Sequence, residues 1–442
     1  MFGRHLSSFV FPLIAVLLLA PLGSLHAQQK TDRITEERLR QMLKDAYDNV
    51  QKNYYDPKIH GFDWDARYHQ FQEKMKRAVT LGQGLTVVAG FLEALNDSHT
   101  FFQPPSRPMQ MDYGFRIQIV GDKPFISRVR PGTDAESKVH PGDEVLQYNG
   151  YTVDRDGLWK MNYYFNRLAP RPGSQLRLRN LNDAEREVKV DAKVRKGKVM
   201  LNLADSEGLD LWQIIREGED SDHLLRQRYI ELGDVMIWKM PEFDMTDDAV
   251  DNMFGFARKH ESLILDLRGN PGGLVKTLER VVGNIFDHDV KIADRIGRKE
   301  LKPELAKSRG DKAFSGKIVV IVDSQCASAA ELFARVIQLE QRGTVIGDRT
   351  SGSVMESRYY GASQGTDTKI FYGFSITDAD LIMKDGKSLE HSGVVPDEVV
   401  LPTAKDISEG RDPVLAHATE LVGLKLDSAQ AGKMFPFEWQ PF

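Results

Sequence analysis

The sequence predicts a multidomain α/β protein, in which a helical region and a small α+β module precede a layered α/β core. Apolar residues recur at helical spacing through residues 32–96, short strand patterns begin at Met109, and strands alternate with helices after Val235. At 442 residues the chain is too long for one compact domain. Its formal net charge of -5 argues against a nucleic-acid partner, which would favour a basic surface.

Residues 1–27 are typical of a secretory signal peptide. Arg4 precedes the apolar run Phe9 to Ala20, and the small Ala27 stands at a suitable cleavage point. The run is short for a membrane span and contains Pro12, so a stable membrane anchor is not expected. We therefore expect an exported protein, periplasmic or extracellular.

The first predicted region after the signal peptide is helical. Apolar residues at helical spacing predict two helices between residues 32 and 79, and a third is predicted from Leu85 to Leu95. The stretch after Asn96, DSHTFFQPPSRP, is polar and then rich in proline, which indicates a loop and a domain boundary. We assign residues 28–108 to this N-terminal helical region.

Short strands then predict a small α+β module over residues 109–199. Strand patterns cover Phe115–Val120 and Pro124–Arg130, and a helical stretch near Trp159–Leu168 precedes another strand, Gln175–Arg179. Residues 200–230 are charged and weakly patterned, so we assign them to a linker.

Strands and helices alternate in the last region, residues 231–442, which indicates a layered α/β core. The predicted elements are the strands Val235–Met240, Ser262–Leu267 and Lys317–Asp323 and the helices Asp247–His260 and Val275–Phe286. A tail from Asp412 contains one further helical stretch.

Two serines lie in patterns that favour a nucleophile. Ser363 lies in GASQG, which matches G-x-S-x-G, but strand patterns flank it on both sides and indicate a hairpin. Ser328 lies in SQCASAAE, between an apolar strand and a helix, where unpaired N–H groups and the helix dipole assist an attacking serine. Ser328 and Glu331 also match a capping box, so the residues alone leave both roles open.

The glycine-rich loop DLRGNPGG, residues 266–273, follows a predicted buried strand. Its glycines allow close approach of the backbone, and a glycine N–H together with the Ala329 N–H would form an oxyanion hole. The alternative is a flexible entry to a helix. Cys326, the only cysteine, is a rival nucleophile, but its place before the helix favours a small buried residue, and no internal disulfide can form.

DLRGNPGG followed about 50 residues later by CASAAE resembles the C-terminal-processing (tail-specific) protease family. The resemblance implies a crotonase-like (ClpP/crotonase) core and a serine-type peptidase. RVRPGTDAESKVHPGDEVLQYNG resembles a PDZ domain, and YYDPKIHGFDWDARY resembles the helical lead-in of the family. The residues in the place of the PDZ carboxylate-binding loop are Tyr113, Gly114, Phe115 and Arg116.

The tail-specific branch of the family uses a Ser–Lys dyad, and this sequence departs from it. The position of the lysine is Ser353, 25 residues after the serine (353 − 328 = 25), and no lysine occurs between Lys317 and Lys369. A branch that resembles the tricorn protease core uses histidine and glutamate instead.

Ser98-His99 and Glu390, ahead of the GVVPD segment, match the tricorn-like pattern. The resemblance implies that Ser328 is the nucleophile and His99 the general base, and that Glu390 orients His99 through Ser98. His391 is a rival base. Gly272, Gly273 and Ala329 would supply the oxyanion hole.

The resulting expectation is an exported serine endopeptidase that forms an acyl-enzyme, with a PDZ-like domain that binds the C-terminal segments of protein or peptide substrates. No H-E-x-x-H and no phosphate-binding motif is present, so neither a metal nor another cofactor is expected. A non-catalytic peptide- or ligand-binding protein and an esterase are the alternatives. The sequence leaves a homo-oligomer open.

Overall fold

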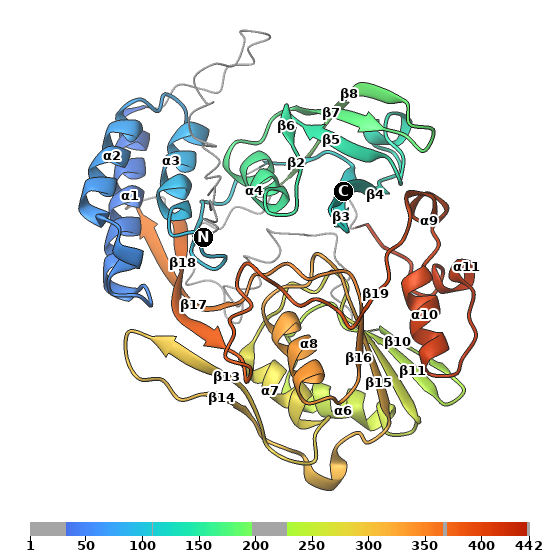
Figure 1. Cartoon of the computed structure of the whole chain (residues 1–442). Coiled ribbons are helices and arrows are strands. Elements are labelled where there is room, and N and C mark those ends of the chain that lie inside the picture. The colour runs from blue at the N-terminus through green and yellow to red at the C-terminus, as the bar shows by residue number, and fades with distance from the viewer. Residues whose placement is uncertain (1–31, 108, 197–227, 366–368, 440–442) are drawn as a thin grey trace, which may run out of the picture.

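The computed structural model describes residues 32–107, 109–196, 228–365 and 369–439 (Figure 1). The predicted signal peptide and most of the predicted linker lie outside the described residues. Within these ranges, no helix combines the length and apolar character that crossing a membrane requires.

Three helices form an N-terminal bundle: α1 (Arg33–Asn53), α2 (Trp64–Lys76) and α3 (Leu81–Glu93). Asp32, Asp63 and Thr80 cap them by accepting N–H groups of the first turns. Helix α3 begins four residues before the prediction, because Gly82 and Gly84 weaken a helical pattern. Gly84 lies so close to α1 that a Cβ atom would come within 2.4 Å of Leu39.

The helical bundle packs on an antiparallel sheet rather than on itself alone (Figure 1). The sheet contains β1 (Phe101–Gln103), β13 (Val290–Gly297), β14 (Glu304–Ala306), β17 (Met355–Gln364) and β18 (Ile370–Ile382). Strand β1 follows the bundle directly and pairs with β18, which fixes the preceding segment, including His99, against the core. Ser363 lies in β17 opposite Phe371, so the expected hairpin is present and no helix follows this serine.

The core contains a six-stranded sheet in the order β10-β11-β12-β15-β16-β19, parallel except for β10. Its strands are β10 (Arg228–Leu232), β11 (Val235–Lys239), β12 (Ser262–Asp266), β15 (Lys317–Val322), β16 (Thr344–Gly347) and β19 (Glu398–Val399). Helices α6 (Asp247–Ala257), α7 (Val275–Gly283) and α8 (Ala329–Leu339) cover one face, and α10 (Pro413–Leu421) covers the other. The predicted layered α/β core is therefore confirmed.

A small domain, residues 115–191, lies beside the core. Its sheet contains β3 (Phe115–Val120), β4 (Lys123–Val129), β5 (Glu144–Tyr148), β6 (Tyr151–Thr152), β7 (Gly173–Arg179) and β8 (Glu185–Asp191). Helix α4 (Leu158–Tyr163) continues into a turn of π-helix, Tyr164–Leu168. The strands β2 (Met109–Asp112) and β9 (Lys193–Lys196) pair with each other at the start and end of the domain.

Strand β3 connects the small domain to the core. The Gln118 side chain donates to Asp323 Oδ2 at 2.9 Å, and the Ser324 hydroxyl donates to the Ile119 carbonyl at 2.5 Å. Asp323 and Ser324 follow strand β15 and precede Ser328. The end of one small-domain strand is thus bonded to the segment that carries the candidate nucleophile.

After β19 the chain forms α9 (Ala404–Glu409), which was not predicted, and then α10 and α11 (Ser428–Ala431) in the tail from Asp412, where the sequence predicted one helical stretch. Short helices leave little periodic pattern to read, which explains the difference. Beyond α11 the chain leaves the core, and the last described residue, Trp439, lies beside Arg116 and Arg130 of the small domain.

Arg155 holds the small domain on the core through a buried carboxylate. Its guanidinium lies 3.1 Å from Asp348, and both side chains are about a tenth exposed. Arg155→Met leaves Asp348 without its cation, so we expect the free energy of unfolding to fall by roughly 3 kcal/mol, measured by urea denaturation. Arg349→Met removes a neighbouring but exposed arginine and should cost less than about 1 kcal/mol. Equal losses in the two variants would contradict this role.

Candidate active site

Ser328 occupies a strained turn between β15 and α8. Its φ is 54° and its ψ is -120°, a backbone conformation that residues other than glycine rarely adopt. Such strain persists only where surrounding contacts hold it, and a sharp strand-to-helix turn exposes a serine at the N-terminus of a helix. The local structure is therefore one that could present a serine to a substrate.

Glu331 is the group that holds this turn. Its carboxylate is fully buried and accepts hydrogen bonds from the N–H groups of Ser328 (3.1 Å), Gly352 (2.7 Å) and Ser353 (2.9 Å) and from the Thr350 hydroxyl (2.5 Å). Burial raises the pKa of Glu331 to about 7, although its four donors favour the ionised form. The predicted capping box is present, and it also binds the segment 350–353 to the start of α8.

Ser353 stands beside Ser328, as the sequence spacing predicts. Its carbonyl accepts the Ser328 N–H at 2.8 Å, and its hydroxyl lies 2.8 Å from that of Ser351. The residue in the lysine position of the tail-specific branch thus contributes a backbone contact to the serine.

The glycine-rich loop is bonded to the segment that precedes Ser328 at two points. Asp323 Oδ1 accepts the Gly269 N–H at 2.9 Å, and the Asn270 carbonyl accepts the Ala327 N–H at 3.0 Å. The buried Asn270 side chain donates to the Met240 carbonyl at 3.0 Å and accepts the Gly272 N–H at 2.8 Å. Asn270 was not singled out in the sequence, where a polar residue in a loop gives no sign of burial.

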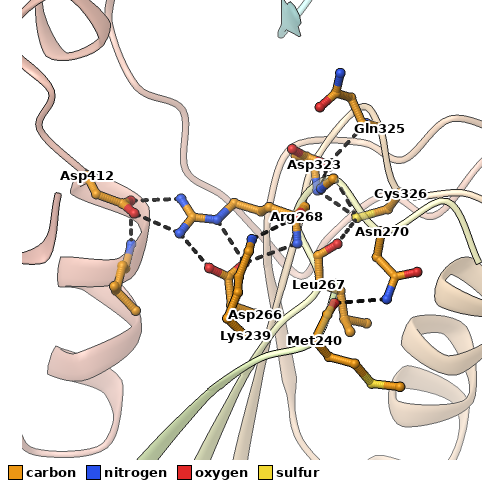
Figure 2. A network of polar contacts seen from close by, with 12 residues as sticks. Lys239, Met240, Asp266, Leu267, Arg268, Asn270, Asp323, Gln325, Cys326 and Asp412 are labelled. Atoms are coloured by element: carbon orange, nitrogen blue, oxygen red, sulfur yellow. Dashed lines mark hydrogen bonds and ion pairs between the residues drawn. The ribbon is translucent and has the colours of Figure 1, made fainter. Parts of the chain in front are cut away.

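An ion network fixes the start of the same loop (Figure 2). Arg268 binds Asp266 through both carboxylate oxygens (2.9 and 2.8 Å) and Asp412, the N-cap of α10, in the same way (2.9 and 2.7 Å). Burial opposes the ionisation of Asp266, but Arg268 and Lys239 hold its pKa well below the ordinary value. The tail helix is thereby tied to the glycine-rich loop.

The backbone of the glycine-rich loop lies directly against Ser328. A Cβ atom on Gly272 would come within 2.6 Å of the Ser328 Cβ and 2.9 Å of the Ala329 nitrogen, and the φ of Gly272 is +99°. Among the described residues, the N–H groups of Gly273 and Ala329 have no hydrogen-bond partner, whereas that of Gly272 is bound to Asn270. Of the three predicted oxyanion donors, Gly273 and Ala329 are thus the two available in this arrangement.

His99, Ser98 and Glu390 form a hydrogen-bonded chain. Ser98 Oγ lies 2.7 Å from His99 Nδ1 and donates to Glu390 Oε2 at 2.8 Å, and the Ser98 N–H donates to Glu390 Oε1 at 2.7 Å. Because the single hydroxyl hydrogen of Ser98 goes to Glu390, Nδ1 must carry the hydrogen of its own contact. The other ring nitrogen, Nε2, is then an acceptor, as a general base requires.

The segment 350–354 connects the turn at Ser328 with the hydrogen-bonded chain of His99, Ser98 and Glu390. Ser353 contacts Ser328, and the next residue, Val354, donates its N–H to Glu390 Oε2 at 2.7 Å. Ser328 and His99 share no hydrogen bond in the part of the chain that the structure describes. Burial lowers the pKa of His99 to about 4, so its ring is neutral at neutral pH.

The rival residues have other roles. His391 Nε2 lies 2.8 Å from the Asn96 carbonyl, which occupies that nitrogen. Cys326 is fully buried, and its thiol donates to the Leu267 carbonyl at 3.0 Å, as expected of a packed residue. No group of three or more His, Cys, Asp or Glu side chains in the described ranges could hold a metal ion.

The predicted carboxylate-binding loop lies at the start of β3. Gly114 has a φ of +72°, and a Cβ atom there would come within 2.2 Å of Thr133 Oγ1. Its N–H donates to Asp112 Oδ1 at 2.9 Å, and the Tyr113 hydroxyl donates to the Arg171 carbonyl at 2.9 Å. Phe115 packs against the core of the small domain, and Arg116 lies beside the C-terminal tail.

A cleft of about 360 Å³ opens beside the hydrogen-bonded chain. It is lined by Ser98, Ser353 and His391 and by the aromatic residues Trp159, Tyr163 and Tyr164 of α4 and the π-turn. The aromatic run WKMNYYF was assigned to a helix in the sequence, but its contact with the site depends on how the small domain sits on the core. Sequence reasoning therefore missed this wall of the site.

Replacement of Glu331 tests its structural role. Glu331→Gln places an amide NH₂ where a carboxylate oxygen accepted hydrogens, so at least one buried donor loses its partner. We expect the free energy of unfolding to fall by about 1–3 kcal/mol in urea denaturation. Glu340→Gln, at the other end of α8 in a partly exposed ion pair with Lys384, should cost less than about 1 kcal/mol. A Glu331→Gln variant as stable as wild type would contradict the role.

The low pKa of His99 has a consequence for acid stability. The unfolded chain binds this proton near pH 6.5 and the folded chain only near pH 4, so this contribution to stability is complete above pH 6.5 and is lost as the pH falls towards 4. We expect the unfolding free energy of His99→Gln to depend less on pH than that of wild type in this window, measured by urea denaturation at several pH values. His288→Gln, at an exposed histidine, should follow the wild type. Parallel curves for His99→Gln and wild type would show that the ring is not desolvated.

Residues 233–400 match peptidase family S41, and residues 35–80 match the tricorn protease C1 domain. A tail-specific protease of Haemophilus influenzae is 24% identical over 322 residues, which cover 68% of this chain and 43% of the relative. The carboxy-terminal processing protease CtpA of Bacillus subtilis is 23% identical over 331 residues, which cover 71% of this chain and 65% of the relative. The matches thus span less than two thirds of these two relatives.

Solved structures share the fold. Mature CPAF superposes with a TM-score of 0.62 at 17% identity, over 85% of this chain and 95% of the other. The photosystem II D1 C-terminal processing protease gives a TM-score of 0.50 at 18% identity, over 89% of this chain and 99% of the other. The resemblance to the C-terminal-processing protease family that the sequence predicts is confirmed by these matches. The similarity to peptidase family S41 is thus carried by residues 233–400, and the similarity to the tricorn protease C1 domain by residues 35–80.

Proposed function

We propose that this chain is an exported serine endopeptidase that cleaves protein substrates through an acyl-enzyme on Ser328. The observation that carries the proposal is the chain Glu390–Ser98–His99, which leaves Nε2 of a neutral imidazole as a proton acceptor. The strained turn at Ser328 and the match to peptidase family S41 support it independently. Export rests on the signal-peptide pattern of residues 1–27.

In the acylation step, Ser328 Oγ attacks the substrate carbonyl while His99 Nε2 takes the hydroxyl proton. The imidazolium that forms is stabilised by its Nδ1–H bond to Ser98, which in turn donates to Glu390. Because desolvation lowers the pKa of His99, charging its ring is costly, and the Glu390 carboxylate offsets part of that cost. His99 then returns the proton to the leaving amine.

The negative oxygen of the tetrahedral intermediate needs donors that are not already bound. The N–H groups of Gly273 and Ala329 meet this requirement, and Ala329 lies at the N-terminus of α8, where the helix dipole adds to the attraction. Water then attacks the acyl-enzyme, with His99 again as the base.

The small domain is proposed to bind the C-terminal segment of the substrate in the manner of a PDZ domain. Strand β3 is an edge strand of its sheet, so an extended peptide could pair with its outer side. Residues 113–116 are the candidate carboxylate-binding loop. Because the end of β3 is bonded to Asp323 and Ser324, a peptide bound along β3 would lie next to the candidate nucleophile segment.

Hydrolysis of an unfolded protein by purified variants tests this proposal. Ser328→Ala should lose activity by roughly 10³-fold or more, and His99→Gln by roughly 10²–10⁴-fold, because each removes a group that acts in the transition state. Ser98→Ala should lower kcat with little change in KM, since Ser98 orients the base and does not touch the substrate. Ser363→Ala, in the GASQG segment of β17, is the matched control and should keep full activity.

Full activity of Ser328→Ala would overturn the nucleophile assignment. Full activity of His99→Gln together with loss in Ser353→Ala would move the base to the segment 350–354. Peptide binding without hydrolysis, and without labelling of Ser328 by a serine-reactive probe, would favour the non-catalytic binding protein. Faster turnover of simple esters than of unfolded protein would favour the esterase.

A further inference from the structure

The last described residues form an aromatic tail, Phe435–Trp439, that crosses from the core to the small domain (Figure 1). Phe435, Phe437 and Trp439 are half-buried, whereas Pro436 and Glu438 between them are exposed. An alternation with period two is typical of an extended segment that lies with one face against a surface. The tail is therefore docked and does not project into solvent.

The small domain presents an arginine face to this tail, formed by Arg116, Arg128 and Arg130. Arg116 and Arg128 lie opposite each other in the β3–β4 pairing, and Arg130 follows two residues later on the same side. The guanidinium of Arg130 lies 4.6 Å from the Trp439 ring centroid, and that of Arg116 lies 5.9 Å from it.

Phe437 and Arg128 continue this contact, with the guanidinium 5.3 Å from the ring centroid. The Phe437 and Trp439 rings also pack edge to face, with centroids 5.0 Å apart. Each aromatic residue of this pair thus lies against both a cation and another ring, an arrangement suited to an aromatic ligand.

The core holds the other end of the tail through Arg228 of β10. Its guanidinium donates to the Pro436 carbonyl at 3.1 Å and lies 5.5 Å from the Phe435 ring centroid. Glu438 is close enough for its charge to act on Arg228. The tail thereby bridges the edge of the core sheet and the small domain.

We propose that the aromatic tail is an intramolecular ligand of the arginine face and competes there with the aromatic, acidic C-terminal segment of a protein substrate. The substrate class rests on the proposed function, in which the small domain receives substrate C-termini. Arg116 is the shared residue, because it belongs to the candidate carboxylate-binding loop and also contacts Trp439. Guanidinium groups suit both parts of such a ligand, since they bind carboxylates and stack on aromatic rings.

The arginine that contacts Phe437 also lies within the electrostatic influence of the glycine-rich loop. Arg128 contacts Phe437, and the charges of Arg268 and Asp412 both reach its guanidinium. Arg268 immediately precedes Gly269 and is held by Asp412 (Figure 2). Displacement of the tail by a substrate changes the surroundings of Arg128.

Because the tail is tethered, a free peptide must compete with a high effective concentration of it. The probe is a fluorescein-labelled peptide with the sequence of residues 433–442, and every protein carries Ser328→Ala so that the probe is not cleaved. We expect the chain that ends at Met434 to bind the probe at least tenfold more tightly than the full chain, measured by fluorescence anisotropy. The full chain with Phe437→Ala and Trp439→Ala should bind the probe as tightly as the shortened chain. This second variant keeps the test valid if shortening impairs folding.

Alanine substitutions in the chain that ends at Met434 locate the binding site of the probe. Arg116→Ala and Arg128→Ala should weaken probe binding at least tenfold, whereas Arg177→Ala, at an exposed ion pair with Glu185 elsewhere in the small domain, should leave it unchanged. A probe in which alanine replaces Phe437 and Trp439 should not bind. The proposal would be overturned if the full chain and the chain that ends at Met434 bound the probe equally well. It would also be overturned if neither Arg116→Ala nor Arg128→Ala weakened binding.

Activity supplies a separate readout. With Ser328 intact, the chain with Phe437→Ala and Trp439→Ala should hydrolyse unfolded protein several-fold faster than wild type, and added tail peptide should reverse the gain. Absence of hydrolysis in every variant would contradict the proposed function and leave the binding result to decide on the tail. Slower hydrolysis by a variant that binds the probe would contradict the competition between tail and substrate.

Discussion

The candidate site depends on one buried carboxylate. Glu331 lies in the first turn of α8, where the helix dipole favours a negative charge, and it accepts four hydrogen bonds from two segments of the chain. One of these segments carries the strained Ser328, and the other leads to Val354 and thus to Glu390. Glu331 therefore holds both the strained Ser328 and the segment that contacts Glu390.

Under the proposed function, histidine replaces lysine as the base without a change of fold. The position of a lysine in the tail-specific branch holds Ser353, whose carbonyl now binds the Ser328 N–H. The histidine is supplied by the segment that enters β1, and pairing of β1 with β18 fixes it against the core. A short, flexible-looking loop in the sequence thus becomes a rigid part of the site, because the strand that follows it belongs to the core sheet.

The local elements could be predicted from the sequence, and the contacts between them could not. Strand β3 was predicted with its observed bounds, since alternating apolar residues and the turn at Gly121 mark it clearly. Helix α3 was predicted to start too late because glycines that permit close packing look like breaks. The roles of Asn270, Arg268 and Trp159 depend on segments far away in the sequence, and single residues carry no pattern that reveals such partners. Ser98, His99 and Glu390 were placed through a family resemblance, and not from periodicity.

The hydrogen-bonded chain joins residues that are 292 positions apart, since Ser98 meets Glu390. A ribosome therefore makes the helical bundle, the small domain and the candidate nucleophile before it makes the residue that orients the histidine. Contacts between residues so far apart in the sequence form slowly, because a long loop must be closed first. A partly synthesised chain that lacks Glu390 would thus have no assembled Glu390–Ser98–His99 chain, and under the proposed function it would not yet be active.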